Sequence, residues 1–268
     1  MTNTNHPPPA TTPLVDKGEP SPSNYPSINS HFGVLDIAGF EKDSTAYYRV
    51  YWRNDTSIVT TFPATWNFPA GSPPAEVAVF AIADSVEIFL NGASFGRQNV
   101  TAFAGARFPN VPRTPGTLMA KSYDASGAVI ATSSISTTGS AVSLLVTAEV
   151  GSESLIADGA DVALVRVSVI DASGAVVPDA GPQLHFTLNG GGGGGGGGEI
   201  IGLANGNPND HTPDKVGMPD LPYGGVWSRS AFNGLARALV RSSTTPAQLN
   251  ITVSSPGLTS GSLIIATA

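Results

Sequence analysis

The hexapeptide Asp-Ala-Ser-Gly-Ala-Val occurs twice, at 124–129 and at 171–176, each time between two runs of β-prone residues. An aspartate can accept hydrogen bonds from the backbone of its own turn, and a glycine adopts the left-handed conformation that such a turn requires. Each copy therefore predicts a tight turn that joins two strands as a hairpin. Because the second copy follows the first after 47 residues, the repeat indicates two successive β domains.

Short strand-like runs continue through the chain from about residue 71. The run Ser85–Leu90 ends at Asn91-Gly92, a pair that favours a two-residue hairpin because both turn positions need a positive φ. Many short strands separated by such turns are typical of β-sandwiches. The sequence therefore predicts an all-β protein with two consecutive sandwiches, at 71–138 and 139–268.

Two stretches have a composition that cannot build a packed core. Residues 1–30 hold seven prolines, which remove backbone donors and disfavour helix, so we expect an irregular Pro-rich leader there. Nine consecutive glycines at 190–198 have no side chains to pack and predict a flexible loop inside the second sandwich. A phosphate-binding loop would need a helix directly after it, whereas Glu199-Ile-Ile indicates a strand.

One short helix is expected within residues 31–70. Asp43 or Ser44 can cap its start. Four aromatic residues follow the spacing of a single helical face, namely Tyr47, Tyr48, Tyr51 and Trp52.

The charge and cysteine counts exclude several classes of protein. The chain has 13 Lys+Arg against 20 Asp+Glu, a net charge of −7, and no cysteine. It therefore has neither disulfides nor a Cys-ligated metal, and an acidic chain offers no patch to neutralise nucleic-acid phosphates. No apolar run approaches the roughly 20 residues of a membrane span. Met1–Pro9 lacks the basic and apolar regions of a secretory signal, which leaves the localisation unknown.

Residues with catalytic chemistry are scattered along the chain. No two of the four histidines lie within five residues of each other, and most carboxylates stand at turns. We therefore expect no catalytic residue, no metal and no cofactor in this chain. The polar cluster Asn205–Asp210 has two interpretations, a loop that binds a sugar or a cation and a merely solvent-exposed loop.

Three aromatic residues lie near loops rich in glycine and proline, where a ring can stack on a sugar. They are Trp66, Tyr223 and Trp227. Each is a candidate for carbohydrate binding, and for each a partly buried packing role is an equal alternative.

Motifs from three consecutive stretches occur together in one order. The first stretch runs from Gly18-Glu-Pro-Ser-Pro22 through Ser27–Asp43 and the aromatic residues of the expected helix to Trp66-Asn-Phe68. The second is Val86-Glu-Ile-Phe-Leu-Asn-Gly-Ala-Ser-Phe-Gly96. The third comprises Ala157-Asp-Gly-Ala-Asp161, Gly202-Leu-Ala-Asn-Gly-Asn207 and Ala231-Phe-Asn-Gly-Leu-Ala236. In this order they resemble the C-terminal part of glycoside hydrolase family 2, the β-galactosidase type.

The resemblance implies a role for each segment. Residues 31–70 would be a remnant of the end of a catalytic barrel with its linker, 71–138 the domain that follows it, and 139–268 a final immunoglobulin-like domain. The catalytic glutamates of the family lie upstream of these motifs, and Glu19 matches a loop position. The implied function is a non-catalytic C-terminal region that braces the barrel or the oligomer, with the upstream barrel of the same gene or of a partner chain as its partner.

Two other functions remain open at this stage. A β-sandwich pair can be a free-standing carbohydrate-binding or adhesion module, or a spacer without a ligand. If no barrel covers residues 31–70, then Tyr47, Tyr51 and Trp52 would form an exposed apolar patch, which predicts self-association through this region.

Overall fold

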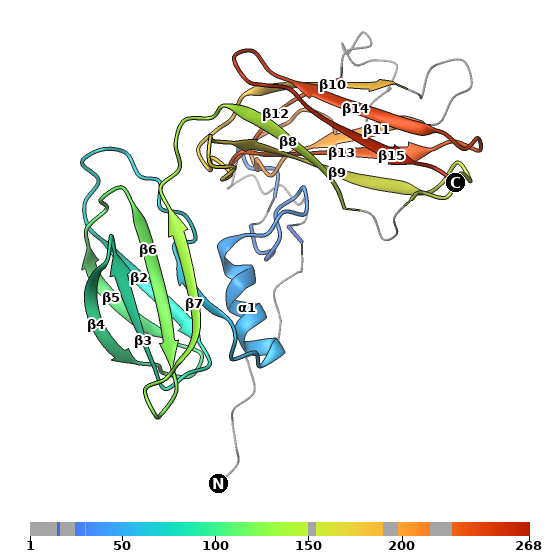
Figure 1. Cartoon of the computed structure of the whole chain (residues 1–268). Coiled ribbons are helices and arrows are strands. Elements are labelled where there is room, and N and C mark those ends of the chain that lie inside the picture. The colour runs from blue at the N-terminus through green and yellow to red at the C-terminus, as the bar shows by residue number, and fades with distance from the viewer. Residues whose placement is uncertain (1–14, 17–24, 30, 150–153, 190–197, 215–226) are drawn as a thin grey trace. The chain divides into compact units, whose positions relative to one another are not determined.

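Strands dominate the protein. The computed structural model describes residues 15–16, 25–29, 31–149, 154–189, 198–214 and 227–268. These residues form four antiparallel sheets and one α-helix, which confirms the predicted all-β class with a short helix (Figure 1). Most of the predicted leader and of the poly-glycine loop lies outside the described residues.

The chain divides into two compact units, and each is described by itself. The first unit comprises Met1–Asp16, Phe32–Asp36 and Glu41–Thr138. The second comprises Lys17–His31, Ile37–Phe40 and Gly139–Ala268. The stretch before residue 42 therefore contributes residues to both units.

The first unit contains the helix and seven strands. Their bounds are α1 Asp43–Arg53, β1 Val59–Phe62, β2 Ala75–Ala81, β3 Ser85–Leu90, β4 Ala93–Asn99, β5 Ala106–Val111, β6 Thr117–Tyr123 and β7 Val129–Ser136. They form two antiparallel sheets with the strand orders β1-β2-β5 and β4-β3-β6-β7. Valine, isoleucine, leucine and alanine side chains from both sheets build one core with Trp66 and Phe108.

The turn at Asn91-Gly92 has the predicted conformation. The φ angles are 51° at Asn91 and 83° at Gly92, and the turn joins β3 to β4. The Asn91 side chain also accepts a hydrogen bond from the Thr117 backbone N–H at 2.8 Å, which ties the turn to β6. The sequence signal for this hairpin is confirmed.

Both copies of the hexapeptide form the predicted aspartate turn. In the first copy, Asp124 Oδ1 accepts hydrogen bonds from the Ser126 N–H and the Ala128 N–H, both at 2.9 Å. This turn joins β6 to β7. Asp171 makes the equivalent contacts. After the second copy the chain pairs back with β9 through an isolated bridge between Ile170 and Val176 and through a hydrogen bond from the Val177 N–H to the Val169 carbonyl at 2.9 Å. The expected second hairpin is therefore shorter than the first.

Helix α1 confirms the predicted helix and corrects its cap. The N-cap residue is Lys42, and no side chain caps the helix start. Asp43 lies in the first turn, where its carboxylate instead accepts a hydrogen bond from the Ala64 N–H at 3.1 Å. Asn54, in the left-handed conformation with φ 50°, ends the helix. At 11 residues it falls well short of the roughly 20 that a membrane span requires, and no other described segment supplies a spanning helix.

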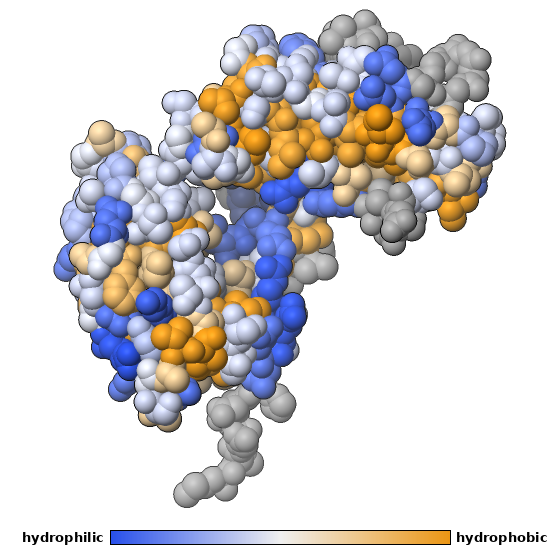
Figure 2. Space-filling model, viewed as in Figure 1, coloured by the Kyte–Doolittle hydropathy of each residue, from blue (hydrophilic) through white to orange (hydrophobic). Residues whose placement is uncertain are grey.

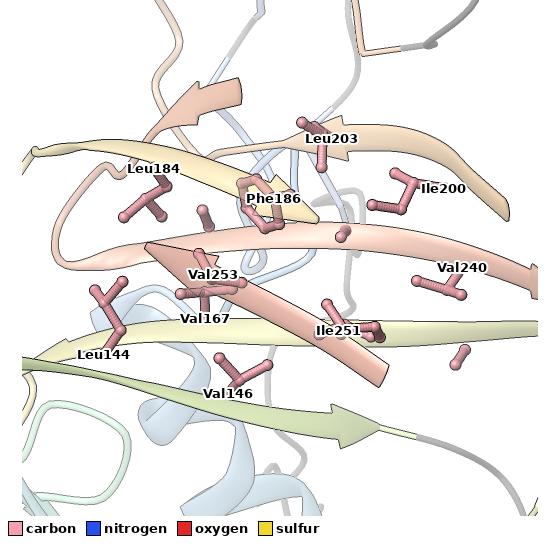
Figure 3. Close-up of a cluster of buried hydrophobic side chains, with 14 of the residues drawn as sticks. Leu144, Val146, Val167, Leu184, Phe186, Ile200, Leu203, Val240, Ile251 and Val253 are labelled. Carbon is pink, nitrogen blue, oxygen red and sulfur yellow. The ribbon is translucent and has the colours of Figure 1, made fainter. Parts of the chain in front are cut away.

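The second unit is a sandwich of two four-stranded sheets. The bounds are β8 Ser143–Glu149, β9 Val162–Ile170, β10 Gln183–Asn189, β11 Gly198–Ala204, β12 Trp227–Ser230, β13 Leu235–Ser242, β14 Gln248–Ser254 and β15 Gly261–Ala266. The strand orders are β11-β13-β9-β8 and β12-β10-β14-β15. Figure 3 shows side chains of both sheets meeting in the core, among them Val167, Phe186, Val240 and Ile251.

Candidate functional site

A polar pocket of about 690 Å³ lies in the second unit, beside the edge strand β12. Strands β10 and β12 and the loop that follows β11 supply its wall. The lining residues are Gln183, Asn207, Asn209, Asp210, His211, Thr212, Pro213, Ser228, Arg229 and Ser230. The volume is within the range of about 300–1,000 Å³ that is usual for small-molecule sites.

Asn205 holds the pocket loop against the sheet. Its side chain is buried, and its Nδ2 donates to the Ser230 carbonyl of β12 and to Asp210 Oδ2, both at 2.8 Å. Its Oδ1 accepts a hydrogen bond from the Asn207 N–H at 3.0 Å. Asparagine and aspartate side chains commonly satisfy turn backbone in this way, so the loop has a defined shape without regular secondary structure.

Arg229 fastens the same loop from inside. It is 4% exposed, and its Nη1 donates to the Thr212 carbonyl at 2.7 Å. Its other two guanidinium nitrogens form ion pairs with Asp210 at 3.2 Å and with Asp214 at 2.9 Å. The positive charge of Arg229 is therefore engaged by the protein itself.

The carboxylate in the pocket wall is held ionised. Burial acts to raise the pKa of Asp210, but hydrogen bonds from Thr212 and Asn205 and the charge of Arg229 together bring it below its ordinary value. At Asp214, which lies next to the pocket, burial outweighs the attraction of Arg229 and raises the pKa. A glycosidase needs a pair of carboxyl groups, one of which stays protonated as the acid. Asp210 is the one carboxylate among the pocket-lining residues, so this pocket lacks that pair.

Tyr25 lies next to His211, one of the residues that line the pocket, and we call it the rim residue. Its ring is 80% exposed and lies 6.0 Å from the ring of His211, measured between centroids. His211 Nε2 lies 2.8 Å from the Pro26 carbonyl oxygen. The segment around Tyr25 is thereby attached to the pocket loop within the second unit.

The loop Asn205–Asp210 shows no cation site in the described residues. Nowhere in that part of the chain do three or more His, Asp or Glu side chains come together as metal ligands would. Within the loop, the Asp210 carboxylate is occupied by Asn205, Arg229 and the Thr212 N–H. The sugar interpretation and the solvent-exposed interpretation of this loop both stay predictions.

The three aromatic residues singled out from the sequence differ in their surroundings. Trp66 is 1% exposed in the core of the first unit, where its indole N–H donates to the Thr114 carbonyl at 3.0 Å, so neither ring face is open to a sugar. Trp227 is half-buried and packs against the core of the second unit. Tyr223 lies outside the described residues. Sugar stacking by Trp227 and Tyr223 stays a prediction.

The expected apolar patch on α1 is smaller than predicted. Tyr51 is buried against Phe103, and this burial raises its pKa to about 12. Tyr47 packs edge-on against Phe80. Trp52 alone of the three predicted residues is widely exposed, at 48%. Of the predicted patch of Tyr47, Tyr51 and Trp52, Tyr51 is therefore buried, Tyr47 is half-buried, and Trp52 is exposed.

Sequence reasoning found the loop of the pocket but not its other wall. Gln183 and Ser230 come from strands 47 positions apart in the sequence, and the antiparallel pairing of β10 with β12 places them opposite each other. The signal that could have indicated them is the polar edge of a strand next to an Asn-rich turn. Tyr25 gave no signal, because it lies within a proline-rich stretch expected to be irregular.

Comparison with known protein families finds a match in each unit. Residues 146–264 match the glycoside hydrolase family 2 C-terminal domain 5, and residues 73–131 match a domain of unknown function, DUF4982. The β-galactosidase BoGH2A of Bacteroides ovatus is 32% identical over 243 residues, which are 90% of this chain and 26% of that protein. The chain belongs to glycoside hydrolase family 2 and corresponds to the C-terminal region of its members. The resemblance seen in the sequence motifs is thereby confirmed.

Other relatives of this glycoside hydrolase family 2 chain are likewise much longer. A β-glucuronidase of Formosa agariphila is 28% identical over 59% of this chain and 16% of its own length. The chain thus spans about a quarter or less of the curated relatives that it matches.

Solved structures show the same fold. A β-glycosidase from Bacteroides vulgatus superimposes with a TM-score of 0.78 at 24% identity, over 95% of this chain and 30% of the other. A glycosyl hydrolase family 2 member from Bacteroides cellulosilyticus gives a TM-score of 0.79 at 22% identity, over 95% of this chain and 35% of the other. These structures therefore show that the β-sandwich fold of this chain also occurs in much longer solved proteins.

Proposed function

We propose that this chain is the non-catalytic C-terminal region of a larger β-glycosidase and that it braces the catalytic barrel or the oligomer. The barrel would belong to the same gene or to a partner chain, and the substrate would be a β-galactoside or a β-glucuronide, as the names of the relatives suggest. Support comes from a match that takes in 90% of this chain but only 26% of the β-galactosidase BoGH2A.

The observation that carries the bracing role is the attachment of the segment that resembles the barrel end. We call residues 25–29 and 31–42 the anchor segment. Residues of the first unit hold one part of it, and residues of the second unit hold the other part. A segment fixed at several points to stable sandwiches can transmit their stability to whatever precedes it in the chain.

In the first unit, Asp16 is the centre of the attachment. Its side chain is 2% exposed and pairs with Lys42 Nζ at 2.6 Å, while its Oδ1 accepts a hydrogen bond from the Gly33 N–H at 2.7 Å. A Cβ atom on Gly33 would lie 2.2 Å from the Asp16 nitrogen, so only glycine fits this approach. The segments around Asp16 and Gly33 therefore lie so close together that one cannot shift along the other without breaking these bonds.

In the second unit, Arg237 holds the anchor segment. Its Nη1 donates to the Ala38 carbonyl at 2.7 Å, its Nη2 pairs with Glu149 at 2.6 Å, and its guanidinium lies over the Phe40 ring at 4.5 Å from the centroid. Earlier in the anchor segment, the Ile28 N–H donates a hydrogen bond to the Pro208 carbonyl at 2.7 Å. A buried cation with three partners is costly to displace, because any loss leaves a charge without its partners.

An activity assay on the purified 268-residue chain tests the non-catalytic half of the proposal. We expect no hydrolysis of aryl β-galactosides or aryl β-glucuronides above the uncatalysed rate, because the polar pocket has one ionised carboxylate where a pair is needed. Saturable hydrolysis that persists through a second, unrelated purification would refute it.

A free-standing carbohydrate-binding module is the second candidate function, and the polar pocket is the observation that favours it. In that case the chain would bind a glycan without any glycosidase in association. The size of the native protein separates the two functions.

A further inference from the structure

We propose that the pocket beside β12 is a binding site for neutral saccharides. The inference concerns the second unit alone and does not depend on the proposed association with a glycosidase. Four features of the pocket carry it: the chemistry of its free side chains, its rigid frame, its charge, and the exposed ring at its rim.

The free side chains in the wall match sugar hydroxyl groups. The Asn209 amide and the Ser228 hydroxyl line the pocket, and neither has a hydrogen-bond partner among the described residues. Gln183 uses its Oε1 to accept a hydrogen bond from the Ser230 hydroxyl at 2.7 Å. Its NH₂ group is left to donate to a ligand in the pocket. Amides and hydroxyls both donate and accept, as sugar hydroxyls do.

The frame around these groups is already fixed. Asn205 bridges the loop and the sheet, and Arg229 binds the Thr212 carbonyl and the Asp210 carboxylate. The Asn209 N–H donates to Asn207 Oδ1 at 2.9 Å. A wall that is ordered before the ligand arrives loses little conformational entropy on binding, so weak individual hydrogen bonds can add up to useful affinity.

The charges select against anionic ligands. Arg229 is the sole Lys or Arg among the lining residues, and its three nitrogens serve Asp210, Asp214 and the Thr212 carbonyl. The Asp210 carboxylate is ionised, since its pKa lies below the ordinary value. A phosphate or a uronate would thus meet the negative charge of Asp210 and no available Lys or Arg, whereas a neutral saccharide carries no such penalty.

The exposed ring supplies the apolar part of sugar recognition. Tyr25 is 80% exposed and packs beside His211, which lines the pocket. The C–H face of a pyranose is apolar and fits the flat face of an aromatic ring, while the phenol group stays available to water or to a hydroxyl. Polar wall and aromatic rim are thus held together by the bond between His211 and the Pro26 carbonyl.

Titration calorimetry with the full chain tests this site. The probes are cellohexaose, xylohexaose and a β-1,4-linked galactohexaose, with an α-1,4-linked galacturonate hexamer as the charged comparison. We expect saturable binding of at least one neutral hexasaccharide and weaker binding of the uronate. The variants Asn209→Ala, Ser228→Ala and Tyr25→Ala should each weaken that binding about 2- to 10-fold, the loss expected for one hydrogen bond or one ring contact.

Two matched variants control for unspecific effects. Thr187→Ala replaces an exposed residue of β10 that does not line the pocket, and Trp52→Ala removes an exposed ring from the first unit. Both should leave the affinity unchanged, and circular dichroism should show all five variants folded. The proposal is overturned if no neutral hexasaccharide binds at millimolar concentration, if the uronate binds more tightly, or if the three pocket variants bind as well as the two controls.

Discussion

The two units bury similar cores and differ in how charge is used around them. In the first unit, a tryptophan and a phenylalanine, Trp66 and Phe108, add bulk to the aliphatic core. In the second unit Phe186 is the one buried aromatic residue that the structure describes in an otherwise aliphatic core, and two buried arginines, Arg229 and Arg237, bind loops and chain segments around it. Apolar surface, orange in Figure 2, is present on both units.

The difference indicates that buried arginines position polar segments in the second unit. A unit stabilised mainly by apolar packing can hold its fold without specifying the position of a neighbouring polar segment. Buried arginines specify such positions, because each guanidinium donates in fixed directions. The second unit therefore positions its part of the anchor segment through Arg237 and shapes the polar pocket. The first unit holds its own part of that segment through Asp16 and also contributes an apolar core and the helix α1.

The largest expected effect comes from the core of the first unit. Trp66→Ala should lower the free energy of unfolding by about 3–5 kcal/mol, because it empties a fully buried site and removes the bond to the Thr114 carbonyl. Hydrogen-exchange mass spectrometry should show lost protection in β2, β3 and β6. The half-buried Trp227, changed to Ala, is the matched control in the second unit and should cost less. Equal losses from both variants would break the comparison between the units.

The next effect should come from the buried arginine of the second unit. Arg237→Ala removes the donor to the Ala38 carbonyl and the partner of Glu149, and we expect a loss of about 1.5–3 kcal/mol in urea unfolding. Arg241→Ala, four residues along the same strand, removes an exposed pair with Glu199 and should cost less than about 1 kcal/mol. If the two variants unfold at the same urea concentration, Arg237 does not have the positioning role assigned here.

A third and smaller effect compares the two identical turns. Asp171 is 6% exposed, and hydrogen bonds from the Ser173 hydroxyl and the Gly139 N–H lower its pKa from 3.8 to about 2. Because the folded-state value is depressed, this carboxylate stabilises the fold above about pH 4, and the contribution is lost as the pH falls toward 2. Asp124 has a lowered pKa from the same local contacts, but among the described residues no N–H from outside its own turn donates to it, as Gly139 does to Asp171.

Urea midpoints at pH 6 and at pH 2.5 measure this difference. Asp171→Asn should lower the midpoint at pH 6 more than Asp124→Asn does, and the gap between each variant and the unmodified chain should narrow at pH 2.5. A gap for Asp171→Asn that is constant with pH would show that its charge is not the cause.

The smallest effect concerns the outer side of α1. The rings of Tyr48 and Trp52 lie 4.7 Å apart on that side, and Trp52 is about half exposed. The predicted self-association of the isolated chain through residues 31–70 should therefore be weak and concentration-dependent in analytical ultracentrifugation. The double variant Tyr48→Ser, Trp52→Ser should remain at the 27.3 kDa monomer. A monomer at all concentrations for the unmodified chain would contradict the prediction.

Local signals in the sequence were enough for the turns and the helix. Asn91-Gly92 and the two aspartate turns depend on residues within five positions of each other, so their chemistry can be read directly. The aromatic spacing predicted the helix but not its cap. The Asp43 carboxylate does not cap the helix, because it accepts a hydrogen bond from the Ala64 N–H, 21 residues away in the sequence.

Long-range pairing decides the features that the sequence left unseen. The pocket depends on the register of β10 with β12 and on Arg229, whose burial no local pattern indicates. The same holds for Trp66, for which the sequence left sugar stacking and a partly buried packing role both open. Its burial follows from the packing of two sheets. Family motifs supplied the order of the domains, which periodicity alone could not.

Immunoprecipitation of the native protein tests the central claim most directly. An antibody raised against residues 140–268 would be used on an extract of the source cells, and the precipitate would be sized and assayed with aryl β-galactosides and aryl β-glucuronides. The account predicts glycosidase activity in the precipitate, carried by a band far larger than 27.3 kDa or by a catalytic partner chain. A lone band near 27.3 kDa without activity would contradict it and would indicate a free-standing binding module.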